Sequence, residues 1–208
     1  LEDRLRRVLL QRFWNLAFPH HPYGIPTIGY REKFLKLSIH DLKNFYKENY
    51  VGENIVITVV GELEAVELRK RIESWPIERG NPVWKDLPSL KIRGPLREIS
   101  TWRVKYPCML IAFYAPSVYQ EDMYALDVFA EYIGGTEASP LKKRLKYRLG
   151  LVSDLSTYSY TPMGPGVWGV ELYLTNEKWD RVLREVVKFL YRYKRVSIKE
   201  EGLERAKR

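Results

Sequence analysis

A chain of 208 residues with 45% hydrophobic and 13% aromatic side chains has the composition of a folded globular protein, which excludes an intrinsically disordered one. It has no apolar run near the roughly 20 residues that cross a bilayer, so we expect no membrane span. Its 35 Lys and Arg residues exceed its 26 Asp and Glu residues by 9. A net charge of +9 attracts nucleic acid, anionic lipid or acidic peptides without choosing among them, and we favour the simpler interpretation of a solvated basic surface. The single cysteine, Cys108, excludes an internal disulfide and a cysteine-based zinc site.

The chain opens with a helical pattern followed by a loop. Apolar residues at helical spacing predict a helix over residues 1–17: Leu5, Leu9, Phe13 and Leu16. Helix-breaking residues then predict an irregular, compact loop: Pro19, Pro22, Gly24 and Pro26.

A second group of elements precedes residue 76. Ser38 is a good N-cap and predicts a helix to about Tyr50. Four apolar residues of this helix should face inward: Ile39, Leu42, Phe45 and Tyr46. The continuous β-branched run Asn54–Val60 predicts a strand covered on both faces. A helix should follow from about Glu62 to Trp75, and it should pack Leu68, Ile72 and Trp75.

Residues 77–97 differ from what surrounds them. Prolines and glycines interrupt this segment, which has little periodicity: Gly80, Pro82, Pro88, Gly94 and Pro95. Such a composition is typical of an inter-domain linker. We therefore expect one domain over residues 1–76 and another over residues 98–208.

The second half of the chain mixes strand and helix signals. Strands are predicted at residues 100–105, 108–115, 152–160 and 167–174. Helices are predicted at residues 121–133, from Ser139-Pro140 to Gly150, and at residues 176–193. Ser197 to Glu200 form a capping box that begins a new helix shortly before Arg208. Both ends therefore fall within helices, as expected of a fragment.

Several motifs follow one another along the chain in the order of a known pattern. Phe18–Gly29 resembles the segment "F-x-x-H-P-Y-G … I-G", and Leu37–Tyr50 resembles the helix that follows it. Asn54–Gly61 resembles "N-x-x-x-x-V-x-G". Ile133–Val152 resembles "L-G-G-T-x-x-S-x-L-x-x-x-L-R-E-x-x-G-L-V-Y", and Glu201–Lys207 resembles "E-E-L-x-x-A-K". These motifs together cover most of the chain, and their order resembles that of the pitrilysin/insulinase family of zinc metallopeptidases, which includes the mitochondrial processing peptidases.

The resemblance implies an α+β fold with two lobes of mainly antiparallel sheet covered by helices. Family members are built from paired α/β repeats. On this reading residues 1–76 are the rear of one repeat, and residues 98–208 are the front of the next.

The zinc motif of the family, H-x-x-E-H, is absent from the sequence. In the second repeat the positions that match the ligands and the base are apolar: Leu126, Phe129 and Ala130. His20 and His21 are adjacent and should point apart, and His40 opens a helix alone, so we expect these histidines to be structural. The resemblance therefore implies no metal ligand and no catalytic residue here, with zinc only if the full-length protein carries the motif upstream.

A second functional feature of the family is an Arg and a Tyr seven residues apart, which help to hold substrate and the oxyanion of the tetrahedral intermediate. The matching positions are Lys146 and Ser153. Lysine still attracts a carbonyl or carboxylate but lacks the planar fork of arginine, and serine is too short to replace tyrosine. Tyr147 and Arg148 lie next to the matching position, where a one-residue offset on a helix should point them elsewhere.

Three hypotheses about function remain open. The first is a part of a zinc endopeptidase, inactive by itself, that binds peptides as an added β-strand and forms a homo- or hetero-dimer with another family subunit. The second is a non-catalytic partner subunit or a structural module. The third, a nucleic-acid-binding module, rests on the charge of +9 and on tyrosines near lysines and arginines, but tyrosine is an ordinary strand residue, so we do not favour it.

Overall fold

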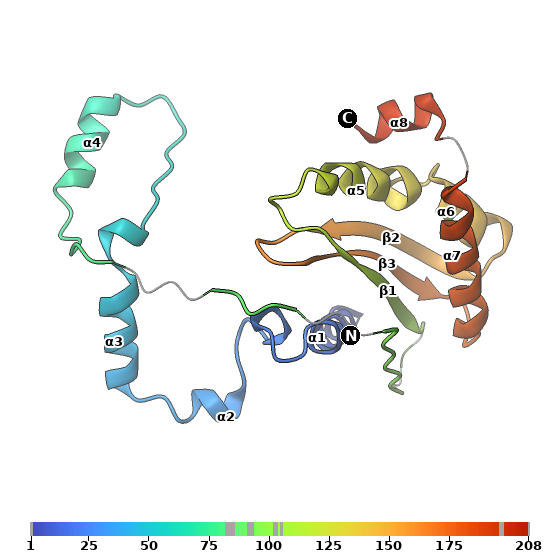
Figure 1. The fold of residues 1–208 in the computed structure, drawn as a ribbon, viewed down its shortest axis with the longest axis horizontal. Coiled ribbons are helices and arrows are strands. Elements are labelled where there is room, and N and C mark those ends of the chain that lie inside the picture. The colour runs from blue at the N-terminus through green and yellow to red at the C-terminus, as the bar shows by residue number, and fades with distance from the viewer. Residues whose placement is uncertain are drawn as a thin grey trace. The chain divides into compact units, whose positions relative to one another are not determined.

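The computed structural model describes residues 2–81, 86–90, 94–101, 104, 106–195 and 198–207. The chain forms two compact units, one of Leu1–Gly24 with Ser89–Arg208 and one of Ile25–Pro88 (Figure 1). This grouping differs from a division at residues 77–97, because the first helix packs against a sheet formed by the second half of the chain.

An antiparallel sheet of three strands organises the larger unit, and it confirms the mixed α+β expectation. The strands are β1 (Cys108–Ala115), β2 (Val152–Tyr160) and β3 (Gly166–Leu174), in the order β1-β3-β2. All three lie where the sequence predicts strands. β3 pairs on both edges, so β1 and β2 each keep one edge without a strand partner among the described residues.

Helices cover one face of this sheet and bury its apolar side chains. They are α5 (Asp122–Ala130), α6 (Pro140–Lys142) and α7 (Trp179–Tyr193), with π-helical turns at Glu131–Gly135 and Lys143–Arg148 continuing the first two. Alternate residues of β3 point into this core: Trp168, Val170, Leu172 and Leu174. Their partners from α7 include Val182 and Val186, which are both buried.

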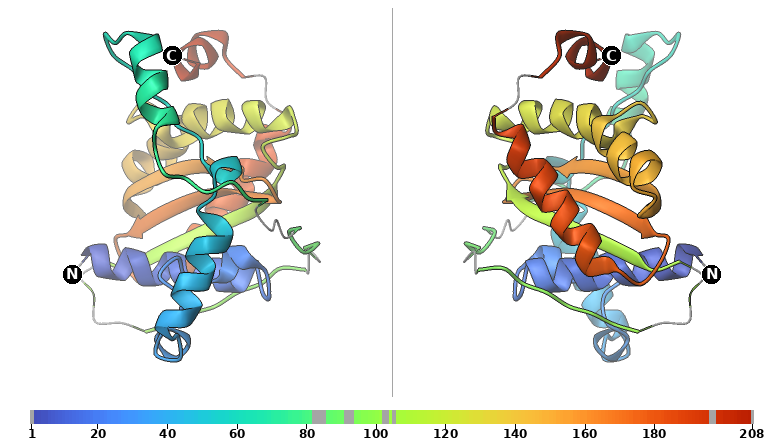
Figure 2. Two further views of the ribbon diagram at one scale, coloured as in Figure 1. Left: turned by 90° about the vertical axis from the view of Figure 1, so that its left-hand side faces the viewer. Right: turned by 90° about the vertical axis from the view of Figure 1, so that its right-hand side faces the viewer.

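The opposite face of the sheet is covered by α1 (Glu2–Ala17), which Figure 2 shows on the other side of the strands from α5. Arg6 of α1 donates three guanidinium hydrogen bonds to the buried Glu171 carboxylate of β3, at 2.8, 3.0 and 3.2 Å. Tyr114 of β1 donates its hydroxyl hydrogen to the Ala17 carbonyl oxygen at 2.6 Å. The sheet is therefore covered on both of its faces.

The smaller unit contains α2 (Arg31–Phe34), α3 (Ile39–Asn49) and α4 (Ala65–Glu73). The Ser38 hydroxyl oxygen accepts from the Asp41 backbone N–H, and the Asp41 carboxylate accepts from the Ser38 N–H, so the predicted cap is confirmed as a capping box. The predicted inward face of α3 is wrong. Its apolar side chains are exposed because no described element of this unit packs over them: Ile39, Leu42, Phe45 and Tyr46.

The strand predicted over Asn54–Val60 is also wrong for this chain. Asn54 ends a short 3₁₀ turn, and Ile55–Val60 lie in no helix or strand. Val56 and Val60 are 92% and 94% exposed, whereas Ile55, Ile57 and Val59 are 38–45% exposed. The run has no strand partner among the described residues, so its backbone groups have no ladder to join. Trp75, which was expected to pack, is exposed as well.

A final helix, α8 (Glu200–Ala206), follows α7. Ser197 of the predicted capping box lies outside the described residues, as do three positions of the strand predicted at residues 100–105. Among the described helices, none combines the length and the apolar character needed to cross a membrane.

Candidate functional site

The candidate site lies at the outer edge of β2, where the loop Thr136–Ser139 joins α5 to α6. Gly134 allows the π-helical turn before this loop to approach β2 closely, because a Cβ at Gly134 would lie 2.5 Å from the Thr157 hydroxyl oxygen. The same hydroxyl donates to the Ala130 carbonyl oxygen at 2.6 Å. These two contacts place the segment before the loop directly against the edge strand.

Lys146 and Tyr147 come from the second π-helical turn and point to the same place. Both reach Oε2 of Glu137, the lysine Nζ at 2.9 Å and the tyrosine hydroxyl at 2.5 Å. The expectation that Tyr147 points elsewhere is wrong. A π-helical turn bonds residue i to i+5, as the Leu149 N–H does to the Arg144 carbonyl, so consecutive side chains diverge less than in an α-helix.

Glu137 is the centre of this cluster. Its Oε1 accepts from the Lys142 Nζ at 3.1 Å, so three donors converge on one carboxylate. The hydrogen bonds from Tyr147, Lys146 and Lys142 lower the pKa of Glu137 to about 2. The same contact with Glu137 raises the pKa values of Lys146 and Tyr147. The three donors therefore favour the ionised form of the Glu137 carboxylate.

Ser153 does not join this cluster. Its hydroxyl donates to the Tyr173 carbonyl oxygen at 3.2 Å, within the sheet. The pairing register of β2 shifts between Val152 and Asp154, which leaves Ser153 as the extra residue of a β-bulge. Bulges re-aim neighbouring side chains, and here Asp154 reaches the cluster, with Oδ1 3.4 Å from Lys142 Nζ and 3.6 Å from Lys146 Nζ.

The sequence predicts Lys146 as a site residue but not Glu137, Lys142 or Asp154. Glu137 stands at an unspecified position of the motif that Ile133–Val152 resembles. Lys142 stands four residues before Lys146, and this spacing places the two lysines on the same side of a helix. That spacing is the sequence signal that could have identified Lys142 as a neighbour of Lys146. The two carboxylates carry no such signal, because only the loop and the bulge bring them to the lysines.

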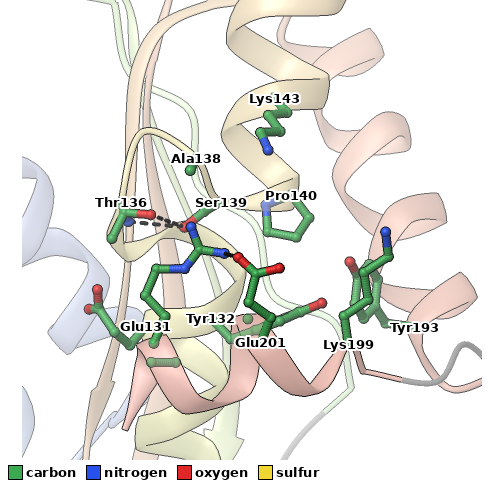
Figure 3. Close-up of a pocket in the computed structure, with 13 residues that line it drawn as sticks. Glu131, Tyr132, Thr136, Ala138, Ser139, Pro140, Lys143, Tyr193, Lys199 and Glu201 are labelled. Carbon is green, nitrogen blue, oxygen red and sulfur yellow. Dashed lines mark hydrogen bonds and ion pairs between the residues drawn. The ribbon is translucent and has the colours of Figure 1, made fainter. Parts of the chain in front are cut away.

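A hollow of about 320 Å³ lies on the other side of the Thr136–Ser139 loop, between the start of α6 and helix α8 (Figure 3). The loop is closed by a hydrogen bond from the Thr136 N–H to the Ser139 hydroxyl oxygen at 3.0 Å and by a hydrogen bond between the Thr136 and Ser139 hydroxyls at 3.1 Å. Arg205 and Glu201 of α8 form an exposed ion pair at its rim. The hollow has side chains of both charges around it and selects no ligand by charge.

The residues present do not fit a catalytic zinc ion. Within the part of the chain that the structure describes, no three His, Cys, Asp or Glu side chains gather as a metal-binding group. The positions matched to the family's ligands are core residues: Leu126, Phe129 and Ala130 pack in or against the core of the larger unit. His21 is buried, and its Nδ1 accepts from the Tyr23 N–H at 3.2 Å, whereas His20 is exposed.

Comparison with known proteins identifies one family. Residues 36–208 match the model described as the peptidase M16 inactive domain. The chain is 22% identical to the zinc protease PqqE of Helicobacter pylori, over 96% of this chain and 47% of that protein. It is also 22% identical to the mitochondrial-processing peptidase subunit beta of Neurospora crassa, over 100% of this chain and 46% of that protein.

A crystal structure of a protease from Helicobacter pylori has the same fold, with a TM-score of 0.81 at 20% identity, over 99% of this chain and 53% of that one. The chain therefore spans about half the length of the proteins that it resembles.

Proposed function

The chain belongs to the peptidase M16 family through its inactive domain, and from this premise we propose that it holds peptide substrates for a zinc-bearing half located elsewhere. That half would lie in the same polypeptide or in a partner subunit of a homo- or hetero-dimer. The 208 residues themselves would supply binding and no bond cleavage, because the positions matched to the zinc ligands are apolar core residues.

The observation that carries this proposal is the convergence of Lys142, Lys146 and Tyr147 beside the edge strand β2. An edge strand offers backbone N–H and C=O groups to an extended peptide, which adds as a further strand. Cationic and hydroxyl donors at that edge supply hydrogen bonds to carbonyl or carboxylate oxygens of the added strand. Lys146 therefore keeps the electrostatic part of the role that the family gives to an arginine. Ser153 is the weaker candidate, because its hydroxyl already bonds within the sheet.

The test is peptide binding by the 208-residue chain, measured by fluorescence anisotropy with labelled unstructured peptides. We expect saturable binding that weakens in Lys146→Gln. Lys178→Gln, which removes one exposed positive charge outside the cluster, is the control. Equal binding by both variants would contradict the role of Lys146. In the same preparations we expect neither stoichiometric zinc by elemental analysis nor cleavage of the peptides.

A second role, as a module that docks to further chain or to a partner, is favoured by one observation. The run Ile55–Val60 is largely apolar and lies in no helix or strand, and Val56 and Val60 are almost fully exposed. Such a run is the typical edge for β-strand addition. Hydrogen exchange at Ile55–Val60 distinguishes the two states: protection in the full-length protein but not in the 208-residue chain would show that docking covers the run.

A further inference from the structure

The Glu137 carboxylate accepts hydrogen bonds from three side chains. Its two oxygens accept hydrogen bonds from Lys142 Nζ at 3.1 Å, Lys146 Nζ at 2.9 Å and the Tyr147 hydroxyl at 2.5 Å. Charge-assisted hydrogen bonds of this kind are about twice as strong as neutral ones, and three of them on one group define its position. The three donors come from a single segment, α6 and the π-helical turn that continues it, so they stay together when Glu137 moves.

Lys142 shows that the site is built rather than a chance meeting of surface charges. Its side chain is only 9% exposed, and its ammonium group lies within 4 Å of two carboxylates, those of Glu137 and Asp154. A buried ammonium group without an anion is costly, so this position requires a carboxylate beside it. The buried charge therefore remains fixed, whichever carboxylate is bound.

Glu137 is less firmly held than its donors. Its side chain is 56% exposed, and it stands in the short Thr136–Ser139 loop rather than in a helix or strand. Its described side-chain contacts are those with the three donors. When Glu137 leaves, Asp154 Oδ1 still faces Lys142 and Lys146, so neither lysine loses its last negative neighbour. Exchange of Glu137 for an external carboxylate is therefore possible without stranding a buried charge.

We propose that Lys142, Lys146 and Tyr147 form a recognition site for one carboxylate of an acidic peptide, and that Glu137 is its built-in competing ligand. The inference rests on the proposed function, since it names the class of peptide that the edge of β2 would hold. The carboxylate comes from an Asp or Glu side chain or from the C-terminus of the peptide. A peptide that lacks both would bind through backbone groups alone and would leave Glu137 in place.

Removal of the competitor is the decisive test. Glu137→Gln keeps the size of the side chain and removes its charge, so the donors become available to an external carboxylate. If Glu137 occupies them about nine-tenths of the time, the variant binds an acidic peptide roughly tenfold more tightly than the wild type. Glu177→Gln, which neutralises an exposed glutamate outside the cluster, is the matched control for the change in net charge, and we expect it to alter affinity less than twofold.

Three labelled peptides separate the sources of the carboxylate: one with an internal Glu and an amidated end, one with neutral side chains and a free C-terminus, and one neutral and amidated. We expect the tenfold gain for at least one of the first two and no gain for the third. Adding Tyr147→Phe to Glu137→Gln should reduce the gain several-fold. Circular dichroism spectra identical to wild type establish that the variants fold.

The outcomes distinguish this inference from the proposed function. If the wild type binds all three peptides and Glu137→Gln gains affinity for none, the carboxylate site is overturned and peptide holding stands. An equal gain for the neutral, amidated peptide, or an equal gain in Glu177→Gln, also overturns it, because the effect is then one of general charge. If no variant binds any peptide, both proposals fail.

Discussion

Strand β3 and the run Ile55–Val60 are both rich in branched apolar residues, yet they lie in different surroundings in the two units. β3 has a strand on each edge, a helical core on one face and α1 on the other. Val170 in its centre is completely buried. In the smaller unit Val60 is 94% exposed, and the run has no strand partner among the described residues.

The difference shows that an apolar, β-branched run needs two further things to become a strand. Its backbone N–H and C=O groups need a neighbouring strand, and its side chains need an element that covers them. The larger unit obtains part of that cover from a helix far away in the sequence, since Arg6 and Glu171 are 165 positions apart. The smaller unit has the run but not the partners.

The largest expected effect compares the same substitution in the two units. Val170→Ala removes buried methyl groups and leaves a cavity, so we expect the free energy of unfolding of the larger unit to fall by about 2–3 kcal/mol. Val60→Ala removes exposed methyl groups, so we expect the free energy of unfolding of the smaller unit to change by less than about 0.5 kcal/mol. Denaturant unfolding followed by circular dichroism measures both. A similar loss in the two variants would show that Val60 is packed in solution.

The second prediction concerns the cover that α1 provides. Arg6→Met leaves the buried Glu171 carboxylate with only the Tyr173 hydroxyl, at 3.1 Å, as its described donor. We expect a loss of about 2 kcal/mol, below the usual cost of breaking a buried pair because the Arg6 side chain is 52% exposed. Arg184→Met, which breaks the exposed pair with Asp180, is the control and should lose less than about 0.5 kcal/mol. Equal losses would mean that the Arg6–Glu171 pair contributes no more to the free energy of unfolding than an exposed ion pair does.

The third prediction tests local order in the smaller unit. Ser38→Ala removes the acceptor for the Asp41 N–H at the start of α3, so the helix should lose about 1 kcal/mol. Amide hydrogen exchange in the first turns of α3 should become faster. Ser74→Ala removes a hydroxyl that donates to the Arg71 carbonyl outside any N-cap, and it should leave exchange in α3 unchanged. Unchanged exchange in Ser38→Ala would indicate that α3 is held by something other than its cap.

The smallest expected effect is a pH dependence confined to the larger unit. Burial lowers the pKa of His21, so the folded state disfavours the imidazolium. The unfolded chain then binds the proton more readily, and His21 contributes full stability above its unfolded pKa of 6.5 and less as the pH falls toward the lowered folded pKa. We expect this decline in the wild type between neutral pH and pH 5, and a smaller decline in His21→Asn. Identical profiles would contradict a buried, neutral His21.

The candidate site was only partly predictable from sequence. Lys146 was found because it occupies a motif position, and Gly150 correctly marks the end of its helix with a φ of +59°. The sequence predicts the wrong direction for Tyr147 because it does not distinguish a π-helical turn from an α-helical one. Asp154 was missed because the β-bulge at Ser153 depends on how β2 pairs with β3.

The sequence by itself determined the features that depend on neighbouring residues: the N-cap at Ser38 and the end of a helix at Gly150. It also located the three strand segments of the larger unit, whose pairing depends on the fold. Tertiary structure alone decided that α1 covers the sheet, that Ile55–Val60 remains outside any strand, and that three donors converge on Glu137. The physical reason is range. Caps and turns are stabilised by bonds within a few residues, whereas a strand partner, a covered face or a converging set of donors requires segments that only the folded chain brings together.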